Sequence, residues 1–162
     1  MEISSDFVGT PLKEYQTEVA WRDVMNYAAA IGDANPRYFD DERPEGIVAH
    51  PLFCVALTWP ILGQIWNHLE AQDFPFHLLA TQVHYLEHLS FFRPIRPGAR
   101  LTIEGRIAAI LPHRSGTQVV IRLDARDGEG AAVFTEHTGA LLRGVRCTDE
   151  GRGGEALPTV PV

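Results

Sequence analysis

The spacing of apolar residues separates a first half that contains the helices from a strand-rich second half. Residues 13–20 alternate as in a strand, and residues 21–31 then carry apolar side chains at helical spacing. Residues 51–69 are apolar nearly all round, which predicts a helix that is buried on most sides. Pro51 fits a first helical turn, whereas Pro60 should kink or split the helix because proline lacks the N–H of the helical ladder.

After Phe76 the pattern is that of strands joined by short turns. Ser115-Gly116 and residues 127–130 have the composition of the turns that connect the strands of hairpins. Strands grouped after helices favour an α+β fold, in which a five-stranded antiparallel sheet wraps around the central apolar helix. The predicted strands of this half are residues 78–92, 99–111, 117–127 and 131–144, and the helix positions expected to be buried are Leu57, Trp59, Ile61 and Leu62.

The length of 162 residues fits one domain with a hydrophobic core of its own. We expect residues 1–146 to form that domain. Residues 147–162 are rich in Gly and Pro and show no apolar periodicity, which is typical of a linker or a loose terminus.

Composition and charge exclude several classes of function. A net charge of −7 argues against nucleic acid or an anionic membrane as the main partner. The acidic N-terminus lacks the apolar stretch of a signal peptide, and the longest apolar run, residues 51–66, is too short to span a bilayer. Cys54 and Cys147 are isolated, which argues against a disulfide framework. We therefore expect a cytoplasmic protein.

Arginine dominates the basic residues, because Lys13 is the one lysine among 14 basic side chains. Arg93, Arg96, Arg100 and Arg106 cluster around one turn. Arginine suits bidentate contacts to phosphate, such as those of coenzyme A. A solvated, arginine-rich surface explains the cluster equally well.

A loop of unusual composition separates the two predicted helices. Gly32 ends the first helical run, and Asn35-Pro36 forces an extended turn that holds Asp33 near the bend. Such a loop can direct a carboxylate into a cleft. The simpler interpretation is that Asp33 and Asn35 only cap backbone groups at the helix exit.

The element order and this Gly-Asp-x-Asn-Pro loop resemble the hot-dog fold of MaoC-like hydratases and dehydratases, which interconvert enoyl and 3-hydroxyacyl thioesters. The resemblance covers roughly residues 14–143. Four segments carry this resemblance; each alone is weak evidence for the family, and together they are specific for it. The segments that carry the resemblance are residues 30–38, 47–53, 91–98 and the closing hairpin.

One departure from the pattern of active members lies in the loop itself. Active members carry Gly-Asp-x-Asn-Pro-x-His-x-Asp, and Asp33, Asn35 and Asp40 match it, but Tyr38 stands where the histidine should be. The family mechanism uses a carboxylate and an imidazole to hold one water. Imidazole suits this role because its pKa is about 6.5, whereas a phenol with a pKa of about 10 is a poor base.

A second departure lies at the start of the buried helix. Active relatives usually have His-Gly where this chain has His50-Pro51, and the glycine N–H polarises the thioester carbonyl. Proline has no N–H, which leaves the N–H of Leu52 or Phe53 as the remaining donor. Both departures are typical of the non-catalytic, N-terminal-type half of paired hot-dog dehydratases, in which one half shapes the acyl tunnel and the other carries the catalytic Asp and His.

The resemblance also implies a substrate, a partner and a set of site residues. The substrate is an acyl thioester, with coenzyme A or carrier-protein pantetheine as part of it, and no separate cofactor is expected. Residues 153–162 are similar to the linker between such halves, so the partner is a second copy or a catalytic hot-dog subunit, separate or fused. The implied residues are Asp33, Tyr38 and His50 for catalysis, and Asn35, Phe53, Leu57, Arg93 and Arg96 for substrate binding.

Other interpretations of the histidines and acids stay open. His84 and His88 share a face of a regular strand, but no third ligand at suitable spacing completes a metal site, so packing is the plain role of His84. His50 is either catalytic or a hydrogen-bonded histidine at the helix start. Asp33 and Glu87 would form a carboxylate pair for thioester hydrolysis.

Three functional hypotheses follow. The first is a subunit of an enoyl-thioester hydratase or 3-hydroxyacyl-thioester dehydratase with a degenerate site. The second is an independently active lyase or thioesterase that uses Asp33 with His50 or Tyr38. The third is a hot-dog module that binds a partner and does no chemistry.

Overall fold

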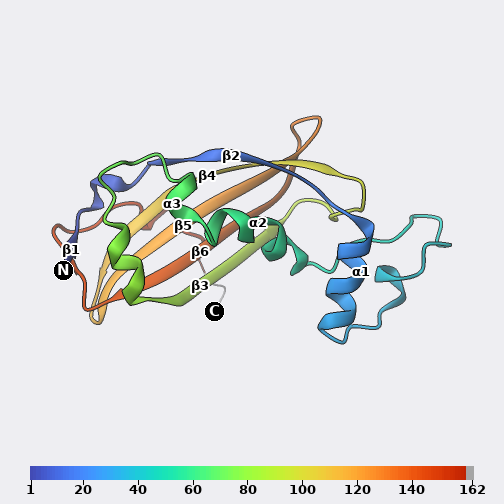
Figure 1. Ribbon diagram of the computed structural model, residues 1–162, viewed down its shortest axis with the longest axis horizontal. Helices are drawn as coiled ribbons and strands as arrows, with labels where there is room; N and C mark the ends of the chain where they lie inside the picture. The colour runs from blue at the N-terminus through green and yellow to red at the C-terminus, as the bar shows by residue number, and fades with distance from the viewer. Residues whose placement is uncertain (160–162) are drawn as a thin grey trace.

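The computed structural model describes residues 1–159 and confirms the predicted α+β hot-dog fold. A five-stranded antiparallel sheet has the order β2-β4-β5-β6-β3 and curves around the helices α2 and α3 (Figure 1). The apolar residues of its inner face pack against α2, since alternate residues of each strand point toward the helix. The strands are β2 (Pro11–Glu18), β3 (Gln82–Phe91), β4 (Arg100–His113), β5 (Gly116–Asp127) and β6 (Ala132–Arg143).

The helices follow the predicted order. Helix α1 (Trp21–Ala30) and the loop after it project beyond one end of the sheet (Figure 1). The predicted long helix is split into α2 (Phe53–Leu62) and α3 (Ile65–His68), and the break falls at Gly63-Gln64, just after Pro60. The described residues also form four short 3-10 helices: η1 (Ser5–Phe7), η2 (Pro36–Tyr38), η3 (Phe76–Thr81) and η4 (Gly154–Ala156). Within residues 1–159, no helix is long and apolar enough to cross a membrane.

The central helix is buried on one side only. Leu57 and Ile61 are buried as predicted and Leu62 is partly buried. Trp59 is 65% exposed, so the prediction that it is buried was wrong. The cause is geometric: the sheet covers the inner side of α2, and nothing in residues 1–159 covers the side that carries Trp59 and Trp66. An apolar helix face predicts burial, but the pattern does not tell whether the rest of the same chain or a partner molecule covers that face.

A β-bulge in β3 overturns the expected alignment of two histidines. His84 pairs with Ala140 of β6, whereas His88 pairs with His137, and the register shifts between His84 and Leu86. Ala140 and His137 are three residues apart and point to opposite faces of the sheet. His84 and His88 therefore do not share a face. The predicted strand also begins later, because residues 78–81 belong to η3.

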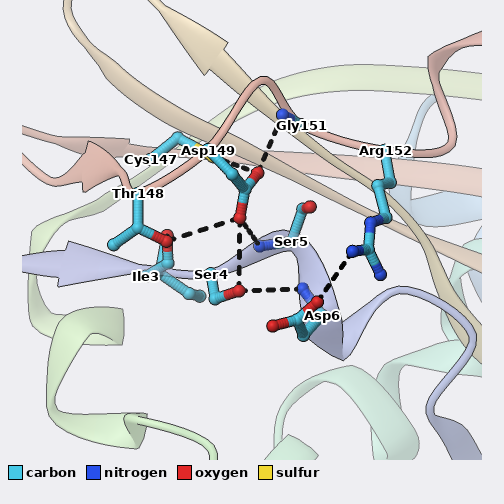
Figure 2. Close-up of polar contacts among 9 residues, drawn as sticks. All are labelled: Ile3, Ser4, Ser5, Asp6, Cys147, Thr148, Asp149, Gly151 and Arg152. Carbon is cyan, nitrogen blue, oxygen red and sulfur yellow. Dashed lines mark hydrogen bonds and ion pairs between the residues drawn. The ribbon is translucent and has the colours of Figure 1, made fainter.

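The described part of the C-terminal segment is not loose. Strand β7 (Arg146–Cys147) pairs in parallel with β1 (Glu2–Ile3), and Arg152 forms a bridge with Ile110. Figure 2 shows Asp149 facing the N-terminal residues Ser4 and Ser5, and its carboxylate accepts the N–H groups of Ser5 at 3.0 Å and Gly151 at 2.8 Å.

The glycine content of this segment suggested a loose structure, but one of these glycines is needed for the segment to pack. A Cβ on Gly153 would lie 2.0 Å from the backbone oxygen of Ala108, so glycine lets the segment lie directly on β4. The last residues of the predicted linker, 160–162, lie outside the described part of the chain.

Candidate functional site

The loop after α1 is shaped by the capping bonds of its own side chains. Gly32 adopts a φ of 74°, and the N–H of Asp33 donates to the carbonyl of Ala28 at 3.0 Å. Oδ1 of Asp33 accepts the N–H of Asn35 at 3.0 Å, and Oδ1 of Asn35 accepts the N–H of Arg37 at 3.1 Å. Both residues thus make the backbone caps that the simpler interpretation assigned to them.

The second oxygen of Asp33 faces His50. Oδ2 of Asp33 lies 3.6 Å from Nε2 of His50, somewhat longer than a hydrogen bond. Nδ1 of His50 accepts the N–H of Leu52 at 3.2 Å. A neutral imidazole that accepts at Nδ1 carries its proton on Nε2, which is the atom directed toward the carboxylate. His50 is therefore both bonded at the helix start and paired with Asp33.

Two tyrosines enclose the imidazole. Tyr38 is buried, and its ring meets that of His50 edge-on with 5.4 Å between centroids. Tyr27 of α1 lies 6.1 Å from His50 and 5.6 Å from Phe53, again between ring centroids. Burial raises the pKa of Tyr27. Tyr27 belongs to the residues 21–31 that show helical spacing, and no motif marked it as a neighbour of His50.

Backbone donors at the start of α2 are occupied. The N–H of Leu52 bonds to the ring of His50, and the N–H of Phe53 donates to the carbonyl of His50 at 2.8 Å. Pro51 has none to offer. The two groups that were left as substitutes for the missing oxyanion donor are thus bonded within the turn.

A large cavity lies at the other end of the central helix. This cavity, which we call cavity 1, measures about 620 Å³ and lies between α2, α3, η3 and the inner face of the sheet, and it is open where the exposed Trp59 and Trp66 line it. Its size falls in the usual range for small-molecule sites. Phe53 and Leu57, predicted to flank the acyl tunnel, are buried in the core and are not part of this lining. Its apolar walls include Trp59, Trp66, Leu69, Phe74, Ile121 and Leu142, and its polar lining is Gln82, His84 and Thr138.

A second cavity of about 430 Å³, cavity 2, adjoins the Asp33 loop. Tyr38 and Pro51 form part of its wall, and Arg93 and Arg96 line it together with Arg37 and Arg43. Arg100 and Arg106, the other two members of the predicted arginine cluster, are not among its lining residues; Arg100 lies 3.7 Å from Glu18. The predicted cluster therefore separates into two parts.

Glu87 does not form the carboxylate pair with Asp33. It lies on β3, where its carboxylate is 3.9 Å from Nε2 of His84 and next to Glu136 of β6. Glu136 is fully buried, and its carboxyl group has only Thr58 of α2 and Glu87 as polar neighbours, neither of them at good hydrogen-bond geometry. Burial beneath α2, reinforced by the charge of Glu87, raises the pKa of Glu136 to about 8.

Nothing in the sequence pattern distinguished Glu136 from an exposed strand residue. The part of the chain that the structure describes holds no group of three or more His, Cys, Asp or Glu residues that could bind a metal ion.

Comparison with known proteins identifies the family of the chain. Residues 6–136 match the family described as FAS1-like, dehydratase domain region. The chain belongs to this family. A UPF0336 protein of Streptomyces avermitilis is 30% identical to this FAS1-like dehydratase-region protein over 152 residues, which cover 88% of this chain and 97% of the relative.

Solved structures with the same fold include dehydratases of two kinds. The HadBC (3R-hydroxyacyl-ACP dehydratase) complex of Mycobacterium tuberculosis has a TM-score of 0.71 at 18% identity, over 84% of this chain and 97% of that chain. A MaoC-like dehydratase of Phytophthora capsici has a TM-score of 0.73 at 23% identity. It covers 96% of this chain, but this chain spans only 52% of it. At these identities the likeness shows the hot-dog fold.

Proposed function

We propose that this protein is the acyl-binding subunit of a paired enoyl-thioester hydratase or 3-hydroxyacyl-thioester dehydratase. The observation that carries the proposal is the separation of cavity 1 from the Asp33 loop. The cavity lies beside Trp59 and Trp66 near the C-terminal end of α2, whereas His50 precedes the N-terminal end of the same helix. An acyl chain in cavity 1 is therefore in a poor position to react at the chain's own Asp33.

The Asp33 site itself supports a non-catalytic role. A hydratase must activate water and stabilise the charge that develops on the thioester oxygen. Here Tyr38 replaces the loop histidine, and the N–H groups of Leu52 and Phe53 are already bonded. Removal of one such donor typically costs roughly a hundredfold or more in rate. The site therefore lacks two of the parts that the reaction needs.

The edge of the sheet supports pairing with a second hot-dog subunit. Within residues 1–159, β3 pairs only with β6, which leaves its other edge unpaired, and its residues Val83, Tyr85 and Phe91 have exposed side chains. An exposed edge strand with apolar side chains is a surface that proteins normally cover. The partial coverage of the Phytophthora capsici protein and the two-subunit HadBC complex are consistent with a second subunit at this edge.

Cavity 1 can be tested as an acyl site without a partner subunit. Because Trp59 and Trp66 line it, an acyl chain that enters should change the intrinsic fluorescence. We expect dodecanoyl-coenzyme A to give a saturable change. Ala140→Leu fills the cavity and should weaken that binding about tenfold, as expected for misfitting methylene groups in an apolar pocket.

Ala132→Leu on the same strand is the matched control, because Ala132 is equally half-buried but does not line the cavity. It should bind like the wild type. Equal binding by both leucine variants and the wild type would contradict the assignment of cavity 1.

A second candidate function is supported by the contact between Asp33 and His50. A carboxylate that faces an imidazole N–H is an acid–base pair of the kind that hydrolases and lyases use. Under this alternative, the chain is an independently active lyase or thioesterase, and His50 takes the role of the missing loop histidine. The two candidates differ in whether removal of Asp33 abolishes turnover by the isolated chain.

A further inference from the structure

Cavity 2 concentrates positive charge in an acidic protein. Four arginines line it, Arg37, Arg43, Arg93 and Arg96, and Glu45 is the one acidic residue of its lining. The whole chain has a net charge of −7. This imbalance at one concave site is the electrostatic signature of an anionic ligand.

Two of these guanidinium groups lack a carboxylate partner. Arg93 pairs with Asp127 at 2.7 Å, and Arg43 pairs with Glu45. Arg96 donates to the backbone carbonyl of Glu45 and acts on its carboxylate only beyond ion-pair distance, and Arg37 makes no ion pair with residues 1–159. Nε of Arg43 is buried there without an acceptor. Arginine in this state is suited to bidentate phosphate contacts.

The remaining wall of cavity 2 is flat and apolar. Phe91, Phe92, Pro94 and Pro51 line it, and Phe92 is 61% exposed. Planar bases stack on aromatic side chains in single-stranded nucleic-acid sites. A cavity that joins several arginines to exposed aromatic rings therefore suits a phosphorylated nucleoside better than a simple anion.

We infer that cavity 2 binds the 3′-phosphoadenosine diphosphate end of coenzyme A. This inference rests on the proposed acyl-thioester function and specifies its carrier. Tyr38 and Pro51 line cavity 2 and also border the start of α2, so a nucleotide held here lies beside the N-terminal end of the helix whose C-terminal end borders cavity 1. A carrier protein would present one phosphodiester and no base, which leaves the aromatic wall without a role.

The test uses adenosine 3′,5′-bisphosphate, which has neither an acyl group nor a thioester. Calorimetry should detect its binding to the full chain, and the affinity should fall with added salt because the contacts are ionic. The double variant Arg37→Gln with Arg96→Gln should weaken binding by about tenfold or more. Phe92→Ala should weaken binding of the bisphosphate and leave binding of inorganic phosphate unchanged.

Arg114→Gln is the matched control. Arg114 is exposed in the turn between β4 and β5, makes no ion pair with residues 1–159, and does not line cavity 2. Its variant should bind like the wild type. Absence of bisphosphate binding at millimolar concentration, or equal binding by the double variant and the control, would overturn the inference.

A further experiment distinguishes coenzyme A from a carrier protein as the source of the bound phosphate. If 4′-phosphopantetheine binds as tightly as coenzyme A and the bisphosphate does not compete, the site serves a carrier protein and the nucleotide assignment is wrong. None of these measurements needs acyl binding or turnover, so failure here leaves the fluorescence test of cavity 1 unaffected. Failure of cavity 1 with intact bisphosphate binding would instead remove the acyl-binding role and keep the nucleotide site.

Discussion

Nε2 of His50 lies 3.6 Å from Oδ2 of Asp33, although the two residues come from different loops. Asp33 is fixed by the turn that follows α1, and His50 is fixed by the bond from the N–H of Leu52 at the start of α2. The pair therefore has the orientation of an acid–base couple. At the neighbouring helix start the N–H groups of Leu52 and Phe53 are bonded within the turn, and the proposed non-catalytic role rests on this occupation of the donors.

The first prediction concerns turnover by the isolated chain. We expect hydration of crotonyl-coenzyme A to be far slower than that of a complete hydratase, and Asp33→Ala to leave the slow rate unchanged. Tyr38→His with Pro51→Gly should act faster than either single variant, because base and donor work as one unit. Spectrophotometric assays measure the rates, and circular dichroism checks folding, since Pro51→Gly loosens the helix start. Rapid wild-type turnover that Asp33→Ala or His50→Ala abolishes would favour the independently active enzyme.

The second prediction concerns the two sides of α2. Leu57→Ala should lower the free energy of unfolding by about 2–5 kcal/mol, because Leu57 is only 6% exposed and its loss leaves a cavity against the sheet. Trp59→Ala on the outer side should cost less than about 1 kcal/mol in the isolated chain. Urea denaturation of both variants gives the comparison. A larger loss for Trp59→Ala would mean that the outer side of the helix is packed in solution.

The third prediction concerns assembly at the edge of the sheet. At micromolar concentration, light scattering should show a dimer of the chain, or a complex with a co-expressed catalytic hot-dog subunit. Val83→Lys with Tyr85→Lys should abolish either complex, because charged lysines on an edge strand oppose strand pairing. Far-ultraviolet circular dichroism controls for folding. A wild-type monomer that recruits no hot-dog subunit would contradict the prediction.

The fold was predictable from the sequence because its signals are local. The apolar run of α2, the alternation of β4 to β6 and the hairpin turns each act within a few residues, and their order fixed the architecture. The bulge between His84 and Leu86 has no such signal, and it moved His88 to the opposite face. The exposure of Trp59 depends on what covers the helix, which periodicity does not report.

The site was predictable only in part, for a related reason. The Gly-Asp-x-Asn-Pro motif predicted the turn at Asp33, and the backbone caps follow from it. Contacts between elements, such as Tyr27 with His50 or Glu87 with Glu136, depend on how α1 and the strands are placed in three dimensions. The docking of the C-terminal segment depends similarly on Asp149 and on the close approach of Gly153 to β4.

The fourth prediction concerns the hydrogen bonds by which Asp149 joins the C-terminal segment to Ser5. The N–H of Ser5, then that of Gly151, hold the pKa of Asp149 well below its usual range. A carboxyl with a lowered folded pKa stabilises the fold above its unfolded pKa, and this contribution is lost as the pH falls through the folded value. Asp149→Asn should therefore speed amide exchange at Ser5 and Gly151 near neutral pH. Asp6→Asn, which removes only an exposed ion pair to Arg152, should leave exchange at Gly151 nearly unchanged.

The last prediction concerns the buried acid beneath α2. Burial raises the pKa of Glu136 to about 8, so the folded chain binds this proton more tightly than the unfolded chain. Its contribution to stability is then fully present below the unfolded pKa of an ordinary carboxyl, near 4.5, and is lost as the pH rises toward about 8. One pKa unit corresponds to roughly 1.4 kcal/mol, so the loss is of the order of a few kcal/mol.

Glu136→Gln keeps the shape of the side chain and removes its proton equilibrium. The free energy of unfolding, measured by urea denaturation between pH 5 and pH 9 at intervals of about one unit, should fall with pH in the wild type and fall less steeply in this variant, in which burial still raises the pKa of Glu87. Glu104→Gln is the control, because Glu104 is an exposed residue of β4, and it should retain the wild-type slope. Parallel slopes for wild type and Glu136→Gln would show that the acid beneath α2 does not hold its proton in the folded chain.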